Sequence, residues 1–143
     1  MAASSLGRAL GLGAAAVALA GCATDDGEPA STAQPTLAWV QANVFTKSCA
    51  VSGCHGAGSP AAGLKLTDAE ASRASLVGIA SKVADGQGGT YLRVAASDPS
   101  KSLLYLVVKG KVGEQRQMPP GLALSAEKVE AIRGWIAAGA LAN

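Results

Sequence analysis

The sequence predicts a small, mostly helical domain behind an N-terminal targeting segment and a flexible tether. Apolar residues recur at the spacing of one helix face over residues 37–45 and again over residues 129–136. Helix-start signals occur at Thr67, Asp98 and Ser125. The 143 residues include only two Trp, two Tyr and one Phe, so a dense core requires apolar surface from a further source, such as a bound cofactor.

Residues 1–21 have the features of a bacterial signal peptide. A single positive charge at Arg8 precedes a short apolar run over residues 9–20, which ends in Leu19-Ala20-Gly21-Cys22. This ending resembles a lipoprotein lipobox. The resemblance implies cleavage before Cys22 and lipidation of Cys22, so that acyl chains anchor the protein to a membrane. An ordinary secretory signal with an incidental cysteine is the alternative.

The residues after Cys22 indicate a location and a tether. Residue 23 is alanine and not aspartate, and similar lipoproteins without that aspartate usually reach the outer membrane of Gram-negative bacteria, facing the periplasm. Residues 24–36 contain no large apolar side chain and are rich in proline, small residues and acid. We therefore expect a lipidated cysteine and flexible tether over residues 22–35, followed by one domain over residues 36–143.

The charge of this domain argues against nucleic acid as a partner. Residues 36–143 hold eleven Lys and Arg against seven Asp and Glu, a net charge of +4. This bias is mild, and aromatic residues do not alternate with the basic ones.

The first half of the domain is expected to place a helix before a glycine-rich region. The helix over residues 37–45 runs into Cys49, and its apolar face consists of Leu37, Val40, Val44 and Phe45. Thr67-Asp-Ala-Glu70 reads as a capping box for a short helix ending near Val77. Residues 78–89 are loose and glycine-rich, and residues 91–94 form a short extended piece.

The second half is expected to hold two more helices and the loop between them. Asp98 caps a helix with Pro99 at its first position, and the cap favours helix over strand for residues 103–108. Residues 111–121 form a loop that contains Met118-Pro119-Pro120. Ser125 caps the last helix, and one face of this helix carries Val129, Ile132, Trp135 and Ile136.

The segment Cys49-Ala-Val-Ser-Gly-Cys54-His55 carries the most chemistry. Two thiols followed directly by an imidazole can attach a haem covalently and ligate its iron. The usual signature has two residues between the cysteines and this chain has four, so the backbone must loop out between them. Gly53 makes such a loop feasible, because glycine adopts backbone angles that other residues avoid.

The composition limits which metal site is possible. His55 is the only histidine, which excludes haem ligation by two histidines of this chain and a zinc site of two cysteines and two histidines. Blue copper also requires two histidines. A thioredoxin-type dithiol expects two residues between its cysteines. Met1 is lost with the signal peptide, so a thioether ligand to haem iron, if there is one, is Met118.

The order of helix, thiol pair with histidine, methionine-proline loop and terminal helix resembles that of class I c-type cytochromes over residues 36–143. The resemblance implies a small cytochrome c-like helical domain around one haem c, in which the first and last helices cross. An aromatic contact then joins Trp135 to Phe45, or alternatively to Trp39. It also implies His55 and Met118 as axial ligands, and a protein that carries electrons and is not an enzyme.

Further expectations concern the surroundings of such a haem. Its apolar surround is expected from Leu64, Leu66, Phe45 and Trp135, and a backbone carbonyl near Pro60 is expected to accept the second N–H of His55. The redox partner is another protein. An acidic partner fits a basic cluster before the methionine, which consists of Lys101, Lys109, Lys111 and Arg116.

Two alternatives stay open at the level of sequence. Cys49 and Cys54 can instead form a disulfide in a structural or binding lipoprotein without haem. The protein can also be a haem enzyme or sensor whose sixth iron position is open.

Overall fold

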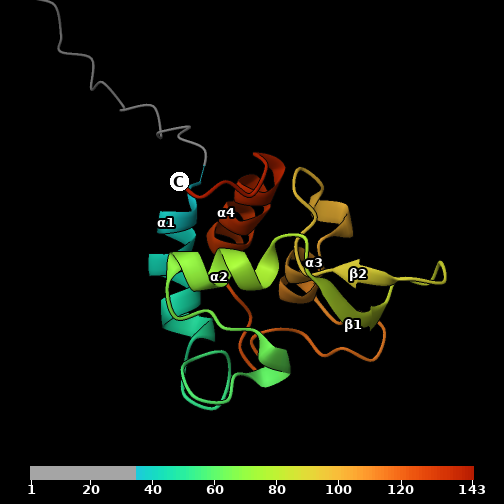
Figure 1. The fold of residues 1–143 in the computed structure, drawn as a ribbon, viewed down its shortest axis with the longest axis horizontal. Coiled ribbons are helices and arrows are strands. Elements are labelled where there is room, and N and C mark those ends of the chain that lie inside the picture. Colours follow the sequence, from blue (N-terminus) through green and yellow to red (C-terminus); the bar gives the residue numbers. More distant parts are fainter. Residues whose placement is uncertain (1–34) are drawn as a thin grey trace, which may run out of the picture. The chain divides into compact units, whose positions relative to one another are not determined.

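The computed structural model describes residues 35–143, in which helices enclose a hydrophobic core and two short strands extend from one side (Figure 1). The expected signal peptide, Cys22 and all of the expected tether except Pro35 lie outside the described residues. Among residues 35–143, no helix is long and apolar enough to cross a membrane. The elements are α1 (Leu37–Val40), α2 (Ala69–Leu76), β1 (Ala80–Ala84), β2 (Thr90–Leu92), α3 (Leu103–Lys109) and α4 (Ala126–Ala137).

The first helix extends to Cys49, as the sequence predicts. Thr36 caps α1, because its hydroxyl accepts a hydrogen bond from the backbone N–H of Trp39 at 3.1 Å. The helix then continues in the wider π form over Gln41–Cys49, and the N–H of Ala50 donates to the carbonyl of Phe45 at 2.7 Å. The predicted apolar face is buried in full: Leu37, Val40, Val44 and Phe45.

Helix α4 packs against both α1 and α3 and brings Trp135 into the centre of the core. The ring of Trp135 meets the ring of Phe45 edge to face, with 6.5 Å between centroids. Its indole N–H donates to the carbonyl of Leu141 at 2.9 Å. The expected aromatic contact between the first and last helices is therefore confirmed, and Phe45 makes it.

Helix α2 begins one residue later than the capping-box prediction. Asp68 is the cap, because its carboxylate accepts from the N–H of Ala71 at 2.8 Å. Thr67 supports this carboxylate by donating its hydroxyl hydrogen at 2.9 Å. Both hydrogen bonds, that of Ala71 above all, lower the pKa of Asp68 below its ordinary value.

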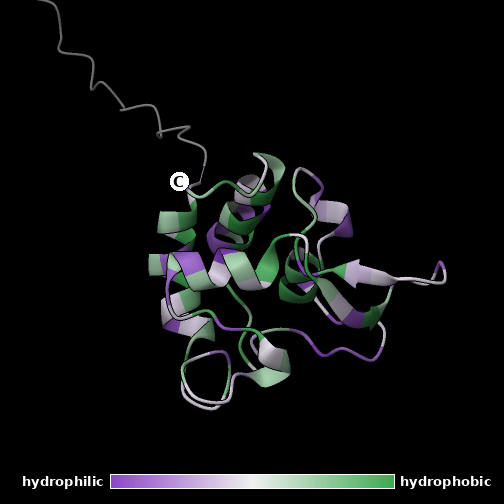
Figure 2. Cartoon of the chain, in the orientation of Figure 1, coloured by the Kyte–Doolittle hydropathy of each residue, from purple (hydrophilic) through white to green (hydrophobic). Residues whose placement is uncertain are grey.

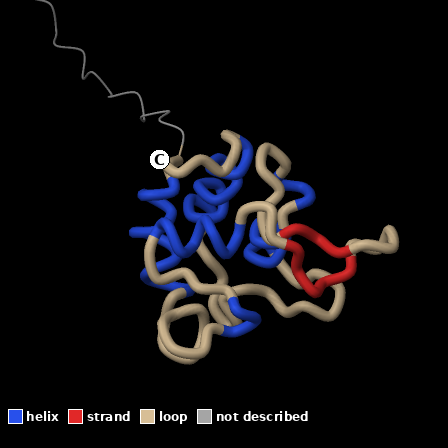
Figure 3. The backbone as a smooth tube through the Cα atoms, in the orientation of Figure 1, coloured by secondary structure: helices blue, strands red, loops and turns tan. Residues whose placement is uncertain are grey.

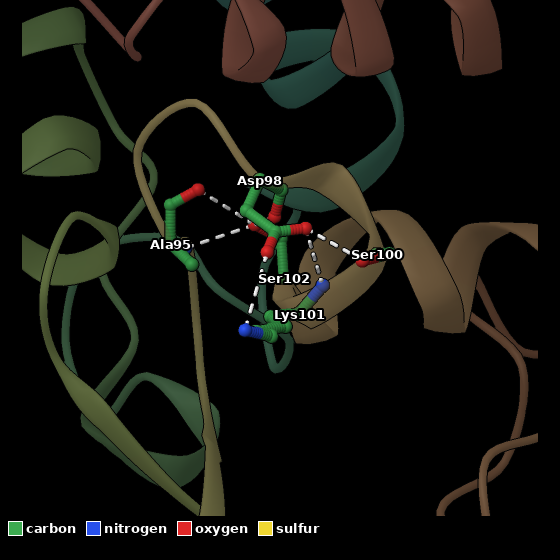
Figure 4. A network of polar contacts seen from close by, with 5 residues as sticks. All are labelled: Ala95, Asp98, Ser100, Lys101 and Ser102. Atoms are coloured by element: carbon green, nitrogen blue, oxygen red, sulfur yellow. Dashed lines mark hydrogen bonds and ion pairs between the residues drawn. The ribbon is translucent and has the colours of Figure 1, made fainter.

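Helix α3 is confirmed as a helix, but it is separated from the predicted cap. Asp98 caps a single 3₁₀ turn over Pro99–Lys101, and α3 begins two residues later. The buried hydroxyl of Ser102 joins the two pieces by donating to the carbonyl of Asp98 at 2.8 Å (Figure 4). The helix that follows is strongly hydrophobic (Figure 2).

The prediction of a mostly α, cytochrome c-like helical domain is wrong. Strands β1 and β2 form an antiparallel sheet, which makes the described chain a small mixed α/β domain (Figure 3). Ala80 pairs with Leu92 and Ala84 with Thr90, and the register is irregular between these pairs. β1 therefore occupies the region that the sequence predicts to be loose.

The turn between the strands explains the error. The carboxylate of Asp85 accepts from the N–H of Gln87 at 2.7 Å and from that of Gly89 at 3.0 Å. Gly86 and Gly88 have φ of 78° and 89°, which favours glycine. A five-residue turn of this kind closes the hairpin although β1 contains a single β-branched residue, Val83, so the strand signal itself is weak.

We predict that Trp135→Ala lowers the free energy of unfolding by about 3–5 kcal/mol, because the substitution opens a cavity at the centre of the core. Urea denaturation followed by circular dichroism measures the loss. Trp39→Ala is the matched control, since Trp39 is only partly buried on the same first helix, and its loss should be smaller. Equal losses for the two variants would contradict this account of the core.

Candidate functional site

One cavity of about 520 Å³ contains all four side chains that the sequence singles out for cofactor binding. Cys49, Cys54 and His55 line it from the end of the first helix and the loop that follows, and Met118 lines it from the loop before α4. These loops lie along the same edge of the molecule in Figure 3. Residues more than sixty positions apart in the sequence thus converge on one space.

The four residues between the cysteines fold into a tight loop, so the widened spacing still directs both thiols to one cavity. Cys49 is the last residue of the π-helical segment. The backbone N–H of Cys54 then donates to the carbonyl of Val51 at 3.1 Å, and the backbone N–H of His55 donates to the carbonyl of Cys49 at 3.1 Å. Gly53 has a φ of 79°, as expected for the residue that lets the backbone turn.

Gly56, directly after His55, is a second structural glycine, and no local sequence pattern singles it out. A Cβ at position 56 would lie 2.7 Å from the carbonyl oxygen of Ala50. The backbone after His55 can therefore pass close to the end of the first helix only because residue 56 has no side chain.

The imidazole of His55 is oriented by a backbone carbonyl, as expected, but the carbonyl belongs to Leu64 and not to the neighbourhood of Pro60. The distance from Nδ1 of His55 to the oxygen of Leu64 is 3.2 Å. A carbonyl oxygen can only accept, so this contact requires the hydrogen on Nδ1. In the neutral ring Nε2 then carries a free lone pair, which is the form that binds a metal.

The loop that carries Met118 is held against α3. The N–H of Met118 donates to the carbonyl of Val107 at 2.9 Å, and the side-chain amide of Gln117 donates to the carbonyl of Val108 at 3.3 Å. These bonds use carbonyl groups in the last turn of α3, which helix geometry leaves without partners inside the helix. The backbone of Met118 is thereby held at the cavity wall.

Cys49 and Cys54 are free thiols in this structure, and both are half-buried. Burial raises the pKa of Cys49 from its ordinary 9.0 to about 11, and the neighbouring Cys54 adds to the effect while Lys128 opposes it. The Cys49 thiol is therefore protonated at neutral pH.

The apolar part of the wall differs from the expected set. Leu64 lines the cavity as expected, whereas Leu66, Phe45 and Trp135 are buried in the core. Their place on the wall is taken by residues that sequence reasoning missed: Val83, Leu103, Val107, Pro119 and Pro120. Val83 arrives through the unpredicted strand β1.

Three cationic side chains also line the cavity: Lys82, Arg93 and Arg116. Arg93 follows β2 and donates to the carbonyl of Ser75 at 2.8 Å and to that of Ala62 at 2.7 Å. Lys82 belongs to β1. Both were missed because the hairpin was missed, and its only clear signal is the Asp85-Gly86 turn.

The expected basic cluster is less uniform than its sequence suggests. Lys101 forms an exposed ion pair with Asp98 at 3.7 Å, and the ammonium of Lys109 lies 5.1 Å from the ring centre of Tyr105. Lys111 is exposed. Of these four side chains, Arg116 is the one that lines the cavity.

In comparisons with known proteins, no family model, no curated protein and no solved structure matches the chain. Within residues 35–143, no group of three or more His, Cys, Asp or Glu side chains is arranged to hold a metal ion. The chemistry of the site is therefore inferred from its own side chains.

We predict that Cys49 reacts slowly with iodoacetamide in the folded, cofactor-free protein. A pKa of about 11 in place of 9.0 leaves a hundredth of the thiolate at neutral pH, so alkylation should be about a hundredfold slower than in urea. Fragment mass spectrometry of the wild-type protein distinguishes alkylation of Cys49 from alkylation of Cys22 and Cys54, and follows it over a pH series. Equal rates in the folded and unfolded protein would contradict the buried environment of Cys49.

Proposed function

We propose that this protein is an electron carrier that holds one haem c in the cavity described above. The observation that supports the proposal most strongly is the convergence of Cys49, Cys54, His55 and Met118 on one cavity. Its volume of about 520 Å³ falls within the range of about 300–1,000 Å³ that is usual for sites of small molecules and cofactors. When bound, the haem supplies a reversible one-electron change at its iron.

The thiols of Cys49 and Cys54 form the covalent link. Each S–H adds across one vinyl group of the porphyrin, so that a carbon–sulfur bond forms and the thiol hydrogen moves to the other vinyl carbon. This addition loses no atom and needs no oxidant. The tight loop between the two thiols supports both links in spite of the four-residue spacing.

His55 and Met118 are the proposed axial ligands. The hydrogen bond from Nδ1 to Leu64 leaves Nε2 of His55 available and fixes the orientation of the ring. Met118 reaches the cavity from a different loop than His55, and its thioether would supply the second ligand to the iron. A thioether paired with an imidazole raises the reduction potential relative to two imidazoles, which suits a carrier.

The remaining wall residues fit the other parts of a haem. Its two carboxylates need cationic or hydrogen-bonding partners, and Lys82, Arg93 and Arg116 supply positive charge on the wall. Leu64, Leu103 and Val107 provide apolar surface that excludes water from the porphyrin. Such a ligand would also add apolar surface next to a core that contains few aromatic residues.

The proposed carrier is anchored to the cell envelope through lipidated Cys22 and faces the periplasm, in the outer membrane if the host is Gram-negative. The tether allows the domain to reach redox partner proteins. Arg116 and Lys111 near the methionine loop favour an acidic partner, since complementary charge accelerates encounter.

We predict that the protein, expressed together with haem-attachment machinery, gives a c-type haemochrome spectrum after denaturation in alkaline pyridine and reduction. Cys49→Ser and Cys54→Ser should each keep one link and give a spectrum shifted toward that of a haem with one free vinyl group. Colourless protein with Cys49 and Cys54 joined in a disulfide would contradict the proposal and support a structural lipoprotein.

We predict that Met118→Ala changes the ferric spectrum, because loss of the thioether opens the sixth position of the iron to water. The absorption that is typical of sulfur ligation to ferric haem, in the far red, should disappear, and the reduction potential should fall. Lys111→Ala, at an exposed position of the same loop outside the cavity wall, is the control. An unchanged ferric spectrum for Met118→Ala would mean that Met118 is not a ligand and would favour a haem enzyme or sensor.

A further inference from the structure

A buried polar network lies behind His55, outside the cavity. The side chain of Gln41, at the start of the π-helical segment, is 8% exposed, and Ser72 of α2 is completely buried. The hydroxyl of Ser72 donates to Oε1 of Gln41 at 2.7 Å, and Nε2 of Gln41 donates to the carbonyl of Leu66 at 2.9 Å. Burying a polar group costs free energy unless the group forms a hydrogen bond, and each buried polar atom of this network has a partner.

The chemistry of the partners fixes the orientation of the Gln41 amide. The carbonyl of Leu66 can only accept, so the amide nitrogen must face it. The amide oxygen then faces Ser72, whose hydroxyl must be the donor. A second amide hydrogen bond reaches the hydroxyl of Thr46 at 3.2 Å. The three contacts leave the amide a single well-defined position between the first helix, α2 and Leu66.

Leu66 connects this network to the histidine. Its N–H donates to the carbonyl of His55 at 2.8 Å, and its side chain is buried in the core. Two residues earlier in the same segment, the carbonyl of Leu64 accepts from Nδ1 of His55. Gln41 therefore holds the segment that supplies the acceptor of the imidazole N–H, and a shift of Leu66 would carry Leu64 with it.

We infer that Gln41, supported by Ser72, is a positioning residue that sets the orientation and basicity of the His55 imidazole through the 64–66 segment. The inference rests on the proposed function in so far as His55 is an iron ligand. A hydrogen bond from Nδ1 to a carbonyl makes the ligating nitrogen a stronger donor, which favours ferric over ferrous iron. Weakening this bond raises the reduction potential.

Gln41→Met tests the inference, because methionine has nearly the same length and shape but cannot donate to Leu66. At a fixed applied potential, the ratio of reduced to oxidised protein should rise about threefold. This is a smaller change than the roughly 10–100-fold losses of metal affinity or activity that follow removal of a direct partner of a metal ligand. Ser72→Ala leaves the bond from Gln41 to Leu66 in place, so its effect should have the same direction and be smaller. Should Gln41→Met fail to fold, Ser72→Ala decides the question alone.

Ser102→Ala is the matched control. Ser102 is also a completely buried serine, but its hydroxyl bonds to Ala95 and Asp98 (Figure 4). Ser102→Ala should lower the free energy of unfolding, as Ser72→Ala does, but its reduction potential should equal that of the wild type. A potential that is unchanged in both Gln41→Met and Ser72→Ala, or changed equally in Ser102→Ala, would overturn the inference and leave the network a structural role.

A second readout needs no haem and separates this inference from the proposed function. In the haem-free protein, the nitrogen chemical shifts of the neutral His55 ring report which nitrogen carries the hydrogen. We expect the hydrogen on Nδ1 in the wild type and in Ser102→Ala, and a mixture of the two tautomers in Gln41→Met. The same tautomer in all three proteins would overturn the inference, even if the wild type carries a haem.

Discussion

The hydrogen bonds between His55 and the 64–66 segment are the constraint on which the proposed site depends. The segment donates to the backbone of His55 through Leu66 and accepts from its imidazole through Leu64. The loop between the cysteines has no regular structure of its own, so its position follows from these bonds and from the close approach of Gly56 to the first helix. Together with the hydrogen bonds inside the loop, they hold the two thiols and the imidazole at one cavity.

The core and the cavity divide the large apolar residues between them. Phe45 and Trp135 fasten the first helix to α4 and are fully buried. The cavity is bounded instead by smaller residues from the hairpin, α3 and the methionine loop. α3 serves both regions, because Leu104 and Val108 face the core while Leu103 and Val107 line the cavity. This helix therefore couples the stability of the core to the shape of the site.

Sequence reasoning succeeded where a local signal had one meaning. The apolar periodicity of residues 37–45 and the cap at Asp98 correctly predicted helical structure. His55 and Met118 share a cavity, and their role as iron ligands stays a prediction. Sequence reasoning failed where tertiary contacts decide. β1 has little strand propensity and depends on the Asp85 turn, so Lys82 and Arg93 were missed on the wall. Which carbonyl accepts from the His55 imidazole depends on the path of the chain after the loop, and no local sequence pattern predicts that path.

The most direct test of the central claim is the intact mass of the mature protein, measured in denaturant after expression with haem-attachment machinery. The account predicts a mass increased by one haem that persists in denaturant, and its loss when Cys49 and Cys54 are both replaced by serine. A mass without haem, or a haem that dissociates on denaturation of the wild type, would contradict covalent attachment at these two thiols.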